Sequence, residues 1–394
     1  MTLAQQAVYH HFVADQENIW GVGEAPFTPG EVLREMLSER GWTQDELAAI
    51  IGVSRASITN LITGRYGVTP EMAAALSAAF GNSADEWMKL DAQYRLAHVR
   101  TDLATIQRRA KLYEIAPVRE MQKRGWISEV DSVEGLEREL EKFFDGEIKD
   151  EPPGFAAAMR KSGNASDLTP AERAWCFAAR KLARGLPVLS FSRSKLDTLA
   201  NKMRKLAAYP KEARRLPVLL ADFGIRFLVV EPIAGAKVDG ATFWLSTQEP
   251  VIAVSIRDDR VDNFWFTVFH EWAHIKNRDA VSVDVNLVGE EGSARNRSDG
   301  DDIERRANEM AASALIKKAD LESFIRRVGP FYSRDRIIQF AHTVKIHPGI
   351  IVGQLQHRDE IKYGTNRHLL VKIRDAVIET AFTDGWGYLT AQSN

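Results

Sequence analysis

Two histidines and a glutamate within five residues have the spacing of a metal site. They are His270, Glu271 and His274, in the sequence HEWAH. In a helix, positions four apart lie on one face, one turn apart, so both imidazoles can bind the same ion. Glu271 can then take a proton from water that the ion activates. The pattern predicts a zinc (Zn2+) centre that hydrolyses peptide bonds, with Glu271 as the catalytic base. The competing interpretation is two histidines that only pack on an apolar helix.

A hydrolytic zinc site has three protein ligands and leaves the fourth position to water, so a third ligand is expected on a later element. The best candidate is Glu304, 30 residues after His274, in the segment IERRANEMAA. Asn308 follows one turn later and could hydrogen-bond a ligand histidine. Glu304 could instead belong to a solvated run of charges at 301–306, and the residues alone leave both interpretations open.

The elements that must position these residues begin near residue 217. Their β-branched content predicts strands at 224–230 and 250–255, with a third strand at 242–245. A long apolar helix is expected from about 262 to 277, and it carries the HEWAH motif among five aromatic residues. The segment 302–360 reads mainly as helices, the first of which would hold Glu304.

Three further residues are candidates for a part in the chemistry. His347, in the sequence IHPGI, could donate a hydrogen bond to a transition state. Because Pro-Gly marks a turn, we favour packing near that turn for His347. Tyr332 and His357 have less support than His347.

The first part of the chain predicts short helices from Thr28 to about Leu90. Thr43 and Glu46 have the spacing of a capping box, in which each satisfies a free backbone donor of the other. Ser54 can cap the following helix. Thr69-Pro70 opens a further one, since proline is tolerated at the first helical position.

Residues 43–65 have the order helix, glycine-containing turn, helix, which is the helix-turn-helix plan. The second helix of such a module enters the major groove of DNA through its N-terminal residues. Arg55 could reach a guanine edge and Asn60 an adenine or a phosphate, while Gln44 could hold a phosphate. The predicted DNA contacts are Gln44, Ser54, Arg55, Ser57, Thr59 and Asn60.

The net negative charge of this module argues against strong binding to DNA phosphates. Residues 31–91 contain nine acids and five bases, a local charge of -4. The stretch 93–125 has eight Lys or Arg against three acids, and 193–215 has eight against two. The stretch 93–125 could supply phosphate contacts that the module lacks. Its basic residues could equally be a solvated face over an apolar stripe, and the two interpretations stay open. The module itself could also bind protein instead of DNA.

Composition limits the remaining classes. The chain has 394 residues, a net charge of -2 and a single cysteine, Cys176, so a disulfide framework is excluded. The first 20 residues lack the basic start and apolar core of a secretory signal. No apolar run approaches the length of a membrane span. We expect a cytoplasmic protein with no membrane contact.

The predicted organisation is mainly α with a small β-sheet (α+β). An N-terminal arm at 1–27 precedes an all-α helix-turn-helix domain at 28–95. A helical connector is expected at 96–180, with a Gly- and Pro-rich linker near 145–170. The segment 181–394 would then form an α+β domain with a C-terminal extension.

The sequences HEWAH and ERRANEMAA resemble the ImmA/IrrE family of metallopeptidases. These bacterial enzymes cleave repressor proteins, and their pattern is HExxH followed by ExxANxxA. The segments 239–244 and 262–267 are also typical of the family. The resemblance, over roughly 180–360, implies a zincin-like fold and makes Glu304 the third zinc ligand. Met310 departs from the phenylalanine usual in the family.

Residues 28–95 resemble the Cro/C1-type helix-turn-helix of HigA-like antitoxins, through TQDELA, GVS and Gly64. This resemblance implies binding to operator or promoter DNA. Modules of this type often act as dimers on two half-sites, so the protein could form a homodimer.

Two functions follow from these observations. The first is a DNA-associated stress or transcription regulator whose zinc endopeptidase domain hydrolyses a regulatory protein, such as a repressor. The second is an antitoxin-type repressor whose peptidase-like domain only senses a ligand or partner. A purely structural zinc site has less support, because such sites have four protein ligands and only three are found here.

Overall fold

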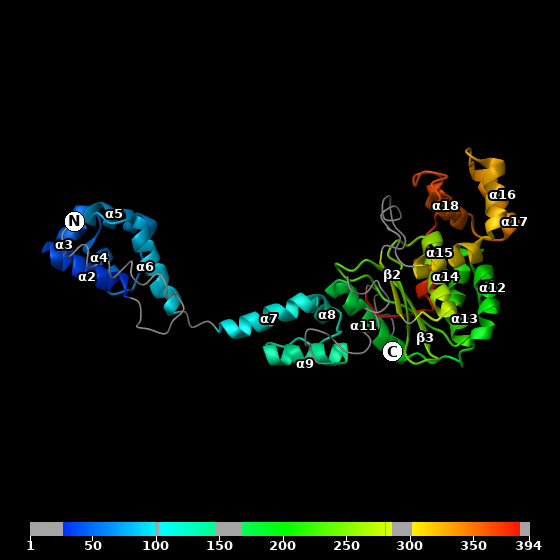
Figure 1. The fold of residues 1–394 in the computed structure, drawn as a ribbon, viewed down its shortest axis with the longest axis horizontal. Helices are drawn as coiled ribbons and strands as arrows, with labels where there is room; N and C mark the ends of the chain where they lie inside the picture. Colours follow the sequence, from blue (N-terminus) through cyan, green and yellow to red (C-terminus); the bar gives the residue numbers. More distant parts are fainter. Residues whose placement is uncertain (1–26, 99–101, 147–167, 280, 286–301, 387–394) are drawn as a thin grey trace. The chain divides into compact units, whose positions relative to one another are not determined.

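The computed structural model describes residues 27–98, 102–146, 168–279, 281–285 and 302–386 (Figure 1). They form two compact units that divide between Leu103 and Ala104. The arm at 1–27, apart from Phe27, and most of the linker at 145–170 lie outside the described residues. No helix in the described part of the chain is long and apolar enough to cross a membrane.

The first unit consists of five helices, each of which begins after a Ser or Thr whose side chain accepts a backbone N–H. The helices are α2 (Pro29–Arg40), α3 (Gln44–Ile51), α4 (Arg55–Ile62), α5 (Pro70–Phe80) and α6 (Ala84–Ala97). The capping box at Thr43 and Glu46 and the cap at Ser54 are confirmed. Gly52 ends α3 at φ 70°, a conformation that favours glycine, so the chain can turn directly into α4.

The core of the first unit lies between these helices. Leu33, Leu47, Ile58 and Leu76 have no exposed surface, and Trp87 is almost fully buried. The Trp87 indole donates a hydrogen bond of 3.0 Å to the side chain of Asn82. One apolar face from each helix therefore builds a core that holds α3 and α4 in a fixed relation.

The second unit is built on a five-stranded mixed sheet. Its strand order is β4-β2-β3-β1-β5. Strand β2 is antiparallel to β3 and β4, whereas β1 is parallel to β3 and β5. The strands are β1 (Arg226–Val229), β2 (Val238–Trp244), β3 (Pro250–Val254), β4 (Val281–Val285) and β5 (Phe382–Thr383). The predicted fold class, mainly α with a small sheet, is confirmed, and β4 and β5 are two strands that the sequence did not predict.

Both faces of the sheet are covered, because alternate residues of each strand point to opposite sides. Phe227 and Ile252 belong to the core shared with α14 (Val261–Asn277) and α15 (Asp302–Leu315). Leu228 and Ala253 belong to the core on the other face. Burial on both sides explains why these strands are continuously apolar in sequence.

The second face is covered by helices that the sequence analysis assigned to a connector. They are α7 (Leu103–Ile115), α8 (Val118–Lys123), α9 (Val133–Phe144) and α11 (Pro170–Arg184). Trp175 of α11 is fully buried, and its indole donates to the Val230 carbonyl at the end of β1. These helices thus share a buried core with the sheet.

The remaining helices complete the first face of the sheet and its surroundings (Figure 1). They are α12 (Leu196–Leu206), α13 (Leu216–Asp222), α16 (Lys318–Val328), α17 (Arg334–Val344), α18 (Pro348–His357) and α19 (Arg374–Ile378). Short 3-10 helices lie at Arg193–Lys195, Pro210–Arg215 and Arg367–Leu369. The helices predicted over 302–360 are confirmed.

Candidate metal centre

Helix α14 is a buried platform for the HEWAH motif. Its aromatic and aliphatic residues pack against the sheet and against α15 and α18. The Thr242 hydroxyl of β2 donates a hydrogen bond of 3.1 Å to the Glu271 carbonyl. The Trp272 indole donates to the Leu196 carbonyl on the other side. The helix is therefore fixed from two directions at the turn that carries the motif.

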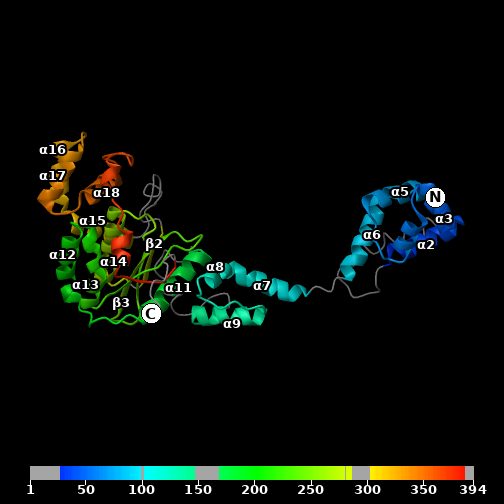
Figure 2. The ribbon, with the colours of Figure 1, turned by 180° about the vertical axis from the view of Figure 1, so that it is seen from behind.

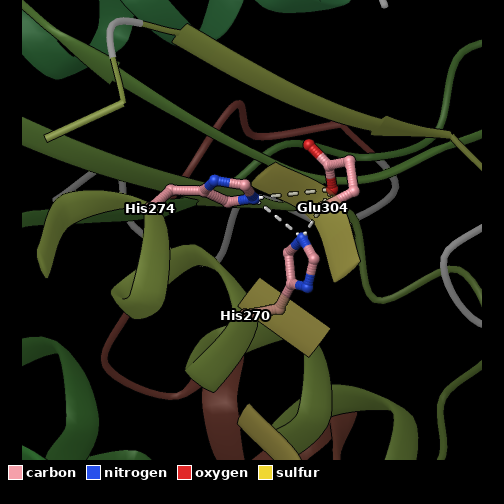
Figure 3. A group of neighbouring side chains, drawn as sticks. All are labelled: His270, His274 and Glu304. Atoms are coloured by element: carbon pink, nitrogen blue, oxygen red, sulfur yellow. Dashed lines mark hydrogen bonds and ion pairs between the residues drawn. The ribbon is translucent and has the colours of Figure 1, made fainter. Parts of the chain in front are cut away.

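Three side chains converge on one point beside this helix (Figure 3). The Nε2 atoms of His270 and His274 are 2.8 Å apart. Oε2 of Glu304 lies 3.2 Å from Nε2 of His270 and 3.6 Å from Nε2 of His274. Tetrahedral zinc with N and O ligands separates neighbouring ligand atoms by about 3.3 Å. The three distances bracket that value, so the donor set fits a zinc ion.

Helix α15 can bring Glu304 to this point because its inner face is made of small residues. Ala307 and Ala311 follow Glu304 at helical spacing and are fully buried. Small side chains let two helices approach closely, and α15 makes its most extensive contacts with α14. The packing of these two helices thus brings Glu304 beside His270 and His274.

The surroundings of Glu304 favour the carboxylate form of its side chain. Burial alone raises the pKa of the Glu304 carboxyl. Its hydrogen bonds to His270 and His274, together with their charge, outweigh burial and hold that pKa below its usual range. The carboxylate is therefore anionic at neutral pH and can act as a metal ligand.

Asp279 orients the second histidine, a role that the sequence analysis missed. Its Oδ2 atom lies 2.8 Å from Nδ1 of His274. Arg278, in the left-handed conformation, ends α14 and turns the chain so that Asp279 faces back toward His274. An N–H at Nδ1 leaves the lone pair of Nε2 for a metal. The usable signal was an acidic residue five positions after the histidine, just beyond a helix end.

Asn308 does not take the orienting role that the sequence suggested. Its Oδ1 atom is buried and has no hydrogen-bond partner among the described residues. Within the described residues its side chain makes no hydrogen bond to His270 or His274, and Asp279 already occupies Nδ1 of His274. The partner expected on α15 is instead supplied by the end of α14.

Glu271 is fully buried and lies against Gly240 of β2. A Cβ atom at position 240 would overlap Oε1 of Glu271 and lie 2.7 Å from Cγ2 of Thr267. Only glycine leaves this space, so Gly240 sets how closely the carboxylate can approach the strand. The sequence shows a glycine here, but its contact with Glu271 depends on the packing of α14 on β2.

The other candidates have structural roles. Nδ1 of His347 accepts a hydrogen bond from the backbone N–H of Gly349 and caps α18, which confirms the turn interpretation. The Tyr332 hydroxyl donates to Glu360 at 2.6 Å, and burial together with that carboxylate raises the pKa of Tyr332. His357 is exposed, with its ring centroid 6.2 Å from that of Phe266.

In the first unit, the predicted DNA contacts lie along α4, at its N-cap and at the start of α3. Ser54 caps this helix and its hydroxyl lies 2.8 Å from that of Ser57. Gln44 accepts a hydrogen bond from Thr59, which ties α3 to α4. Arg55 is exposed and pairs with Asp45 at 3.3 Å. Gln44, Ser54 and Ser57 thus have structural partners within the module, as well as their predicted contacts with DNA.

Two arginines of the basic stretch at 93–125 make contacts within the second unit. Arg108 pairs with Glu134 and Glu137 of α9. The guanidinium of Arg124 is almost fully buried and donates to the carbonyls of Glu231 and Pro232. These two arginines stabilise the fold, which favours a structural interpretation for them over phosphate contacts.

Comparison with known proteins places the first unit in a family. The family described as "Helix-turn-helix" matches residues 33–87, and the chain belongs to this family through that unit.

Among curated proteins, the chain is 30% identical over 82 residues to the uncharacterized HTH-type transcriptional regulator YddM of Escherichia coli (strain K12). This match covers 20% of the chain and 87% of that protein. The chain is also 38% identical over 66 residues to antitoxin HigA-1 of Vibrio cholerae. That match covers 16% of the chain and 62% of HigA-1.

Solved structures with similarity include a Pseudomonas aeruginosa protein crystallised with its operator DNA. It is 36% identical and has a TM-score of 0.19, covering 19% of this chain and 82% of that one. Pseudomonas aeruginosa antitoxin HigA, solved with the higBA promoter, is 32% identical with a TM-score of 0.19. That match covers 24% of this chain and 98% of HigA.

Proposed function

We propose that this protein is a DNA-associated regulator whose second unit is a zinc endopeptidase acting on a regulatory protein. The observation that carries the proposal is the convergence of His270, His274 and Glu304, with Glu271 on the same helix turn. Among the described residues this group offers three ligands, which leaves one position open, as in hydrolytic sites.

The chain's own residues divide the work of peptide hydrolysis. His270, His274 and Glu304 would hold the zinc ion, and Asp279 keeps His274 in the tautomer that binds metal. When bound, zinc polarises a carbonyl and lowers the pKa of water. Glu271 accepts a proton from the attacking water and returns it to the leaving amine. The buried surroundings strengthen each of these electrostatic contacts.

The test is Glu271→Gln in the full chain, with zinc content measured beside cleavage of regulators encoded near the gene. General acid–base catalysis contributes roughly 10²–10⁴-fold, so cleavage should fall by that order while zinc is retained. Glu309→Gln, an exposed glutamate on α15, is the matched control. Equal cleavage by Glu271→Gln and wild type would exclude the peptidase mechanism.

The DNA-binding part of the proposal rests on the helix-turn-helix family and its regulatory relatives. Arg55 is the exposed cation at the start of α4, where such modules read base edges. Arg55→Ala should weaken footprints on the protein's own promoter, with a loss of roughly 1–3 kcal/mol at a contacted guanine. Arg326→Ala, in the second unit, is the control. If Arg55→Ala protects the promoter as wild type does, Arg55 is not a reader.

A second candidate function is an antitoxin-type repressor whose second unit only senses a ligand or partner. The observation that favours it is complete burial of His270, Glu271 and His274. A sensor would bind zinc and protect its promoter, and both activities would survive Glu271→Gln. Promoter protection that changes with zinc loading, without cleavage of any regulator, would favour this function over the peptidase.

A further inference from the structure

Helix α7 carries an apolar stripe that the described residues of the second unit leave uncovered. Leu103, Ile106 and Tyr113 are 60%, 54% and 45% exposed, and Ala110 between them is also exposed. Their spacings of three, four and three are those of the a and d positions of two heptads. A row of large apolar residues on one helix face indicates an interaction surface.

The other side of α7 anchors this helix on the second unit. The Arg108 guanidinium pairs with Glu134 and Glu137 of α9 at 2.8 and 2.7 Å. Leu112 is buried in the core that α7 shares with α9 and α11. At about 100° per residue, Arg108 and Leu112 point roughly 160° away from the stripe. Figures 1 and 2 show α7 and α9 side by side in both views. The stripe is therefore held facing outward.

We propose that this stripe is a dimer interface, in which α7 pairs with α7 of a second copy as a short parallel two-stranded coiled coil. Leu103 and Ala110 would occupy a positions, and Ile106 and Tyr113 d positions. Such a pair is isologous, because the same residues meet across a two-fold axis and the assembly closes at two chains.

The charges beside the stripe identify a second copy as the occupant. In this register Arg109 is a g position and Glu114 an e position, and both are exposed. A parallel pair brings the g residue of one helix to the e residue five positions later on the other, so Arg109 meets Glu114 of the second copy. Arg109 also donates to the Asp131 carbonyl, and its guanidinium has further N–H donors for a carboxylate.

An antiparallel pair would instead place g beside g and e beside e, which brings like charges together. The parallel arrangement suits a protein whose helix-turn-helix unit lies just before α7, since such units act on two half-sites as dimers. Only that last argument rests on the proposed DNA binding; the stripe and its charges do not depend on it.

Cysteine cross-linking tests the contact and its direction. The chain has one cysteine, Cys176, which is buried, so it can serve as the background. Ile106→Cys places a thiol at a d position, where it meets its counterpart in a parallel pair. Lys111→Cys is the matched control, since Lys111 is exposed on the same helix but at a b position. With oxidised glutathione and no DNA, Ile106→Cys should dimerise far faster than Lys111→Cys. Equal rates, or no dimer at Ile106, would overturn the proposal.

Sedimentation of the full chain provides the second measurement. Ile106→Glu should raise the dimer dissociation constant roughly tenfold or more, because it buries a charge in the seam. Val218→Glu, at an apolar residue of α13 that is 61% exposed, should leave it unchanged. Arg109→Glu should weaken the dimer and Arg109→Glu with Glu114→Arg should restore it. A wild-type protein that stays monomeric up to about 100 μM would contradict the proposal. This holds also if hydrogen exchange shows that the first unit of the same chain covers the stripe.

Discussion

At the scale of single residues, the candidate metal centre depends on two residues outside the proposed ligand set. Asp279 lies 2.8 Å from Nδ1 of His274 and so decides which nitrogen of this ring carries the proton. Gly240 leaves the space in which the Glu271 carboxylate lies. Neither residue belongs to the HEWAH motif, yet both control how the motif's side chains are presented.

Replacing Asp279 is predicted to weaken metal binding without unfolding the protein. Asp279→Ala removes the acceptor at Nδ1 of His274, and loss of such a partner typically costs 10–100-fold in metal affinity. Competition with a chromophoric chelator measures the zinc dissociation constant directly, so no substrate is needed. Asp320→Ala, at an exposed residue of α16, is the control. An unchanged dissociation constant for Asp279→Ala would show that the hydrogen bond does not matter for the ligand.

At the scale of elements, the centre is a junction of two helices and a strand. Helix α14 supplies His270, His274 and the proposed base Glu271, α15 supplies Glu304, and β2 contacts the other side through Thr242. The alanines of α15 set the distance between the helices. The position of Glu304 is thus a consequence of helix packing.

Enlarging the contact between α14 and α15 should therefore disturb the site from a distance. Ala307→Leu adds a branched side chain to a fully buried position and should destabilise the second unit by about 1–3 kcal/mol. It should also weaken zinc binding, because Glu304 lies one turn away on the displaced helix. Denaturant unfolding and the chelator titration measure the two effects.

Ser313→Leu is the control for this change, since Ser313 is exposed on the same helix. Ala307→Leu could instead lower stability and leave the zinc dissociation constant at the wild-type value. That result would contradict the idea that the packing of α15 places Glu304 as a zinc ligand.

At the scale of the whole molecule, the chain consists of two units with separate cores. Separate cores can unfold as separate transitions. Zinc would bind only the folded second unit, so it should stabilise that unit alone. At a free zinc concentration of 100 times the dissociation constant, the gain is about 2.7 kcal/mol.

Chelation should therefore move one of two transitions in calorimetry of the full chain. EDTA is expected to lower the melting temperature of the second unit and to leave that of the first unit where it was. Hydrogen exchange resolved by peptide assigns each transition to its unit. The His270→Ala variant should have the melting temperatures of the chelated wild type, and EDTA should not change them. A shift of both transitions in the wild type would contradict the independence of the two units.

Much of the local structure was predictable because it depends on neighbouring residues. The capping side chains of Thr43, Ser54 and Thr69 each accept a hydrogen bond from the backbone N–H three positions ahead, so short sequence patterns predict where these helices start. The pairing of His270 with His274 follows in the same way from one turn of helix. Strand β5 was missed because two residues give no periodicity to detect, and β4 was missed although its sequence VSVDV alternates apolar and polar residues.

The sequence by itself thus determined the helix that carries HEWAH, the helix-turn-helix unit and the apolar character of the sheet, because each depends on spacing within one element. Only the tertiary structure decided that Glu304 meets the histidines, that Asp279 replaces Asn308 beside them, and that α11 covers the sheet. Those contacts join residues whose separation along the chain says nothing of their distance in space. They are set by packing, which depends on all the residues of the core at once.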